Sequence, residues 1–221
     1  MGAITRAAAN NITTSGVILP AGINDASVAS ITALAQVSAG DGITLISSQT
    51  ASSSASLSFT TGIDSTYRTY MFKFINIHPQ TDDKDFGFNM STDGGSSYNV
   101  VKTSASFLSR HDESGSTSAL EYYGNTHSAQ STSYEIIAKA SGADSDQAIS
   151  GTLMLFQPSS TTFVKHYILS LNHIIHADTC FTHYTGGYGN TTSAINAIDF
   201  KMVNGGNLDD GIIKMYGVAK S

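Results

Sequence analysis

Short stretches of alternating apolar and polar residues dominate the chain from about residue 43 onward. A period of two places every second side chain on one face of an extended strand, so the pattern predicts strands with one buried face. The clearest stretch covers 70–77, where Phe72 and Phe74 share a face before Pro79. Strands are expected over 43–48, 56–60, 70–77, 86–90, 98–101, 134–138, 150–156, 162–175, 181–184, 195–203 and 211–218.

Turn residues separate these stretches. Asp93 and Gly94 lie between two alternating runs, which indicates a hairpin. The polar residues 109–130 are expected to form a long loop, interrupted at most by a short strand over 120–123. About ten strands, with no convincing long helix after residue 40, predict an all-β fold, an antiparallel jelly-roll-like β-sandwich. Alternating helices and a fixed repeat are missing, which disfavours a parallel α/β sheet and a solenoid.

The first 40 residues follow a different pattern. Residues 1–36 contain no aromatic side chain, and Asn24 and Asp25 could cap a short amphipathic helix that carries Val28, Ile31 and Leu34. Such a short helix is marginal alone and needs a partner surface. Three alternatives stay open: packing on the chain's own sandwich, a flexible tail, or a docking and oligomerisation arm. The expected division is an N-terminal arm over 1–40 and a β-sandwich domain over 41–221.

Composition excludes several classes of protein. The chain of 221 residues has a net charge of −6, and its 11 Lys and Arg residues form no basic stripe, so nucleic-acid binding is not expected. No apolar run is long enough for a membrane helix, and the residues after Met1 resemble no secretory signal peptide. One cysteine, Cys180, cannot form an intrachain disulfide. The 32 Ser and 24 Thr residues suit strands whose outer face is hydroxylic rather than ionic.

Two groups of residues have the chemistry of metal ligands. His173, His176, Cys180 and His183 are ligand types for zinc or iron, but residues three apart on a strand point to opposite faces, so hydrogen-bonded or exposed histidines are the preferred interpretation. The acidic group of Asp82, Asp83, Asp85 and Asp93 could hold Ca²⁺, but it has no EF-hand spacing and fits a solvated loop better.

Signatures of enzymes are absent. The chain contains no GxSxG, P-loop or HExxH motif, and no spacing marks a pair of carboxylates for glycoside hydrolysis. We therefore predict no catalytic residue, no cofactor-binding residue and no metal site.

Tyrosines mark a candidate binding surface. Tyr122 and Tyr123, and Tyr184 and Tyr188 within a glycine-rich stretch, are expected in loops at one end of the sandwich. Tyrosine offers a flat contact area with one hydrogen-bonding tip, which suits sugars or protein partners. Packing within the loops or across a subunit interface is the alternative.

Several stretches resemble structural virion proteins, of the fibre or decoration type, from marine and cyanobacterial tailed bacteriophages. The resemblance runs along most of the chain and includes GAITRAAANN near its start and STDGGSSY in the middle. The stretches that carry it are 2–11, 58–67, 70–79, 91–98, 156–166, 191–198 and 211–218. These motifs are structural, so the resemblance implies a virion component and assigns no active-site residue.

The expected function is that of a non-catalytic virion structural protein, a head- or tail-attached fibre or decoration protein that forms a homotrimer. Its arm would bind other virion proteins of the capsid or tail, and assembly would take place in the host cytoplasm without membrane insertion. A module at a fibre tip that binds a host receptor or surface glycan is the alternative, and an enzyme such as a depolymerase comes third.

Overall fold

The computed structural model describes residues 42–122, 124 and 126–220, which form twelve strands and no helix. Within this part of the chain, no helix is therefore long and apolar enough to cross a membrane. The strands are β1 (Ile43–Thr50), β2 (Leu57–Phe59), β3 (Tyr67–Pro79), β4 (Lys84–Ser91), β5 (Lys102–Asp112), β6 (Ser118–Glu121), β7 (Glu135–Ser141), β8 (Ile149–Phe156), β9 (Lys165–Ile175), β10 (Thr179–Gly189), β11 (Ala197–Met202) and β12 (Leu208–Lys220).

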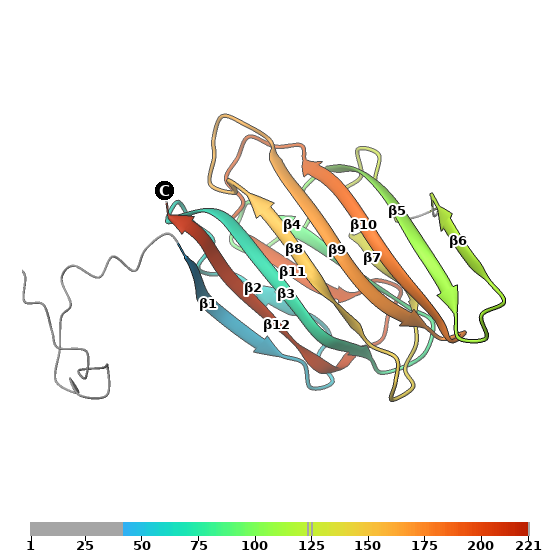
Figure 1. Ribbon diagram of the computed structural model, residues 1–221. Helices are drawn as coiled ribbons and strands as arrows, with labels where there is room; N and C mark the ends of the chain where they lie inside the picture. The colour runs from blue at the N-terminus through green and yellow to red at the C-terminus, as the bar shows by residue number, and fades with distance from the viewer. Residues whose placement is uncertain (1–41, 123, 125, 221) are drawn as a thin grey trace, which may run out of the picture. The chain divides into compact units, whose positions relative to one another are not determined.

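The strands form two layers, and every pairing is antiparallel (Figure 1). The larger layer, called here the front sheet, has the order β1-β12-β3-β8-β9-β10-β5-β6, and the smaller rear sheet has the order β2-β11-β4-β7. A single pairing of Ser141 with Ile175 joins β7 to β9, so the two sheets are continuous at that point. The prediction of an all-β antiparallel fold is confirmed.

Phenylalanine rings fill the space between the sheets. Phe200 of β11 lies at the centre, with its ring centroid 5.2 Å from that of Phe74 and 5.5 Å from that of Phe72. Phe59, Phe86 and Phe88 complete the contacts around it at 6.2 to 6.3 Å, and the Phe59 ring has the edge-to-face geometry that aromatic rings prefer. The alternating pattern therefore identified the buried face of β3 correctly.

Three predicted elements differ from the structure. Residues 109–112 belong to β5 and 118–121 form β6, so the predicted long loop is largely a hairpin. The predicted strand over 181–184 is an eleven-residue strand, β10, and residues 98–101 precede β5 instead of forming a strand. Polar residues occupy buried positions in β10, including Thr179, His183 and Thr185, and so hide its apolar period. The expected arm, its helix and the boundary at residue 40 lie outside the described residues.

Candidate functional site

The outward face of the front sheet carries a row of apolar residues that crosses seven strands. Each residue lies opposite the next in the strand register, and the row, called here the apolar row, consists of Leu45, Tyr216, Met71, Met154, Ile168, Gly186 and Ala105. Leu45 at one end and Ile168 toward the other are 52% and 57% exposed. Tyr216, Met71 and Met154 between them are half-buried, so the row exposes apolar surface mainly near its two ends. Exposed apolar patches of this kind mark binding or assembly faces.

A groove of about 730 Å³ lies over β5, β9 and β10 at one end of the apolar row. Ala105 and Gly186 lie side by side in its floor, and a Cβ added at Gly186 would meet no atom within 4 Å. Phe107 and Tyr184 form one wall, where their rings stack with centroids 5.2 Å apart and planes inclined by 19°. Ile168 and Tyr122 also line the groove, so its surface is mostly apolar.

The tyrosines singled out in the sequence are partly brought together by the fold. Tyr122 and Tyr184 line the same groove, and Tyr188 lies four residues along β10, on the same face as Tyr184. The expectation that Tyr184 and Tyr188 lie in a loop is wrong, because both belong to β10. Tyr123 lies outside the described residues.

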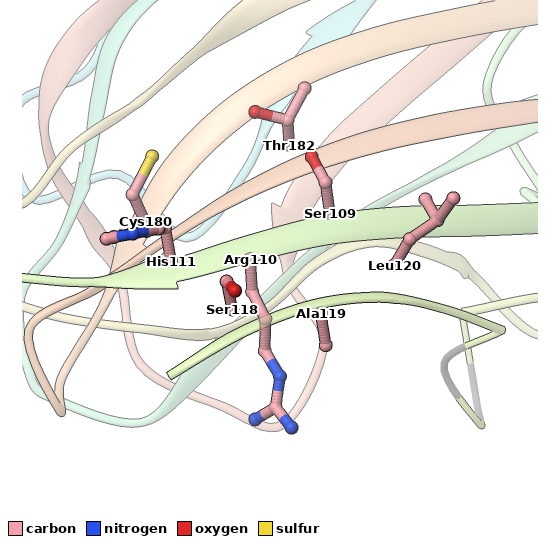
Figure 2. Close-up of a pocket in the computed structure, with 8 residues that line it drawn as sticks. All are labelled: Ser109, Arg110, His111, Ser118, Ala119, Leu120, Cys180 and Thr182. Carbon is pink, nitrogen blue, oxygen red and sulfur yellow. The ribbon is translucent and has the colours of Figure 1, made fainter. Parts of the chain in front are cut away.

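A second, more polar pocket of about 600 Å³ lies farther along β5 and β10. Figure 2 shows the side chains of His111 and Cys180 next to each other, with Ser109 and Thr182 nearby, while Arg110 points away on the opposite side. The Cys180 sulfur lies 3.0 Å from the amide nitrogen of Asn172, and Arg110 forms a 2.9 Å ion pair with Glu121. Ser109, His111, Cys180 and Thr182 therefore supply the polar part of the pocket lining.

The four candidate metal ligands do not converge. His173 and His183 are buried on the inner face of the front sheet, whereas Cys180 is exposed on its outer face and His176 follows the end of β9. Within the described ranges, no group of three or more His, Cys, Asp or Glu side chains is placed to hold a metal ion. The fold thus brings His173 and His183 together and places Cys180 on the opposite face of the sheet.

Two of these histidines, His173 and His183, are buried side by side. Their ring centroids lie 5.1 Å apart, and Nε2 of His173 lies 2.9 Å from the carbonyl oxygen of Lys139. Burial lowers the pKa of His173 to about 4 and that of His183, which also lies beside His173, to about 3. Among the described residues, neither ring nitrogen of His183 has a hydrogen-bond partner.

Three of the acidic residues considered as Ca²⁺ ligands accept hydrogen bonds from different parts of the chain. Asp82 accepts a hydrogen bond from the amide of Ala143, and Asp85 accepts one from Ala140. Asp93 accepts hydrogen bonds from Ser91 and Ser97 within its own turn, and these bonds lower its pKa. The carboxylates therefore hold loops in place.

Sequence reasoning missed a buried polar cluster to which β4, β5 and β7 contribute side chains. Lys102, Asn89 and Glu135 are all buried, and Nζ of Lys102 donates a 2.6 Å hydrogen bond to Oδ1 of Asn89. Ser104 and Ser128 donate hydrogen bonds to the Glu135 carboxylate. Nothing in the local sequence distinguishes Lys102 from a solvated lysine at the start of a strand, because its partners are distant in sequence.

The geometry thus defines a sandwich-like all-β protein whose larger sheet carries an apolar row and a groove on its outer face. Comparisons with protein-family models, with curated proteins and with solved structures find no match. Inferences about function therefore rest on the residues and their arrangement.

Proposed function

We propose that the chain is a non-catalytic structural protein of a tailed-phage virion, a head- or tail-attached fibre or decoration protein that acts as a homotrimer. Its strand order carries the proposal. The set β1-β12-β3-β8 lies in the front sheet and the set β2-β11-β4-β7 forms the rear sheet. These two sets follow the connectivity of a jelly roll, with β5-β6 and β9-β10 as additions that widen the front sheet.

Jelly rolls are frequent in viral capsid proteins and in lectins. A fold alone does not define a function, so the choice between virion assembly and glycan binding has to rest on the surface of the protein. The apolar row and its groove favour assembly, because an apolar surface is matched by apolar side chains of another protein. The sequence resemblance to phage virion proteins supports the same choice, and the N-terminal arm would then bind capsid or tail proteins.

Two separate apolar patches on the front sheet support a cyclic oligomer. Ile43 and Leu45 on edge strand β1 are 61% and 52% exposed, and the groove at β5, β9 and β10 lies several strands away on the same sheet. A heterologous interface joins one patch of a subunit to a different patch of the next, and a ring forms when the rotation closes. We propose that Ile43 and Leu45 of one copy occupy the groove of the next copy in a closed trimer.

Light scattering on the full chain at micromolar concentration tests this arrangement. The wild-type protein is expected to have three times the mass of one chain, and Ile168→Asp or Leu45→Asp is expected to yield monomers. Phe163→Asp is the matched control, because Phe163 is 67% exposed but lies in the β8–β9 connection. A monomeric wild type, or a trimer that survives Ile168→Asp, would overturn the proposed interface.

Binding of a host receptor or surface glycan is the second candidate, and it is favoured by the meeting of Tyr122 and Tyr184 in one groove. The groove offers few polar groups to a sugar, because Ser106 and Thr185 are buried and Ser170 is the exposed serine in its lining. The test compares binding of wild type and a Tyr122→Ala/Tyr184→Ala variant to host cells and to extracted surface glycan. Loss of binding by a variant that remains trimeric supports this candidate, and no binding by the wild type removes it.

A further inference from the structure

The buried contact between Lys102 and Asn89 joins the two sheets. Asn89 lies on β4 of the rear sheet and Lys102 on β5 of the front sheet, and both side chains are buried. Nζ of Lys102 lies 2.6 Å from Oδ1 of Asn89 and 3.0 Å from the carbonyl oxygen of Val100. The C=O bond is about 1.2 Å long, so Nζ lies at most about 3.8 Å from Cγ of Asn89. A short movement therefore brings the amine to attacking distance of the amide carbon.

Hydrogen bonds fix the orientation of the Asn89 amide. Its Nδ2 donates to the carbonyl oxygens of Tyr98, at 2.7 Å, and Thr132, at 2.8 Å. Only the nitrogen can donate to two carbonyls, so the oxygen must face Lys102. The backbone N–H of Met90 donates to the same Oδ1 at 2.8 Å. An oxyanion formed on Asn89 would therefore already have a fixed hydrogen-bond donor.

The lysine is prepared to act as a nucleophile. Burial lowers its pKa to about 8, so roughly a tenth of the amine is uncharged at pH 7 and about half at pH 8. Glu135 is the carboxylate whose charge acts on Lys102, and burial raises the pKa of Glu135. The two groups do not form an ion pair within 4.0 Å, so a proton passes between them only through a water molecule or after a rotation of the lysine side chain.

We propose that Lys102 and Asn89 join spontaneously through an amide bond that ties the two sheets together. Lys102 first gives one proton to Glu135, and the neutral Nζ then attacks Cγ of Asn89. The bond from Cγ to Nδ2 breaks, Nδ2 takes one proton from Glu135 and leaves as ammonia, and the extra proton on Nζ returns to Glu135. One N–C bond forms and one breaks, and no oxidant or cofactor is needed.

The bond would change the mechanical and thermal behaviour of the fold. It would close residues 89–102 into a covalent ring and fix β4 of the rear sheet to β5 of the front sheet. A cross-link between the sheets resists their separation by heat or by force. This inference does not depend on the proposed function, because the reaction requires only the folded chain.

Mass spectrometry of the full chain tests the bond directly. The wild-type protein, incubated near pH 8, is expected to weigh about 17 Da less than its sequence, the mass of one lost ammonia. Trypsin is expected to leave Lys102 uncut and to release a peptide of residues 85–110 that carries the loss. A mass equal to that of the sequence, in a folded wild-type protein, would overturn the proposal.

The peptide also separates the cross-link from a competing reaction. A succinimide at Asn89 loses ammonia as well, but it leaves Lys102 open to trypsin. A loss of the same mass with normal cleavage at Lys102 therefore overturns the proposal, and fragment ions that join Asn89 to Lys102 support it.

Variants assign the roles of the side chains. Lys102→Arg and Asn89→Ala are expected to show the mass of their sequences, and Glu135→Gln is expected to form the bond at least tenfold more slowly. Lys165→Met is the matched control, because Lys165 is also buried but donates to the backbone carbonyls of Phe163 and Thr191 instead of to an amide side chain. This variant is expected to retain the loss. The wild-type peptide decides the question even if a variant does not fold.

Discussion

Buried polar side chains determine much of the behaviour of this sandwich at the scale of single residues. Lys165 donates to two backbone carbonyls, and Glu135 accepts hydrogen bonds from two serines, so most of these groups have replaced water by protein partners. His183 differs, because neither of its ring nitrogens has a partner among the described residues. A buried group of this kind strongly resists acquiring a charge.

The two buried histidines predict sensitivity to acid. Their pKa values of about 4 and about 3 lie below the ordinary value of 6.5, so the unfolded chain binds protons more readily than the folded chain below pH 6.5. Stability is therefore complete above pH 6.5 and falls as the pH decreases toward 3. At pH 5 each histidine can lower the free energy of unfolding by up to about 2 kcal/mol.

Denaturation in urea at pH 7.5 and pH 5 measures this effect, and His183→Leu provides the comparison. Leucine cannot be protonated, so the difference in unfolding free energy between the two pH values is expected to shrink by about 1 to 2 kcal/mol. His176→Leu is the control, because His176 is only partly buried and lies outside the sheet. An unchanged pH dependence in His183→Leu would contradict the prediction.

At the scale of elements, the sequence predicts those strands whose buried positions are apolar. The pattern of β3 is direct, because Tyr70, Phe72 and Phe74 are all buried on one face. The sequence pattern does not predict the full length of β10, because glycines and buried polar residues interrupt its apolar period. This strand is stabilised by hydrogen bonding to β5 on one side and to β9 on the other. The groove could not be predicted either. Its lining depends on the register of β5, β9 and β10, and the local pattern of β10 does not reveal that strand.

Two adjacent glycines of β10 provide a matched test of how this strand packs. A Cβ added at Gly187 would lie 2.5 Å from the hydroxyl oxygen of Tyr167 and 2.8 Å from Cβ of Ser104, whereas one added at Gly186 would lie in open space. We expect Gly187→Ala to lower the free energy of unfolding by about 1 to 3 kcal/mol through overpacking. Gly186→Ala should change it by no more than about 0.5 kcal/mol. Urea titration measures both, and equal effects would contradict the assigned register.

At the scale of the whole molecule, the chain combines a two-layered, antiparallel β fold with an N-terminal segment of different composition. The two sheets share an aromatic core, and β1 is an edge strand, hydrogen-bonded to β12 on one side. The sequence could predict the layered β fold from its periodicity. It could not decide whether residues 1–40 pack on the sandwich or bind elsewhere, because a short amphipathic helix fits either surface.

Removal of residues 1–40 distinguishes these alternatives. The core of the sandwich is built from residues between Ala51 and Met215, so a chain that begins at Asp41 is expected to unfold cooperatively, with a melting temperature within about 3 °C of the full chain. If residues 1–40 are a docking arm, their removal leaves the stability of the sandwich unchanged. Their removal also abolishes binding to purified virions or capsids. If the arm packs on its own sandwich, its removal exposes apolar surface and lowers the melting temperature by well over about 5 °C. Calorimetry of the two chains, followed by a binding assay with virions that lack the protein, therefore tests the docking role directly.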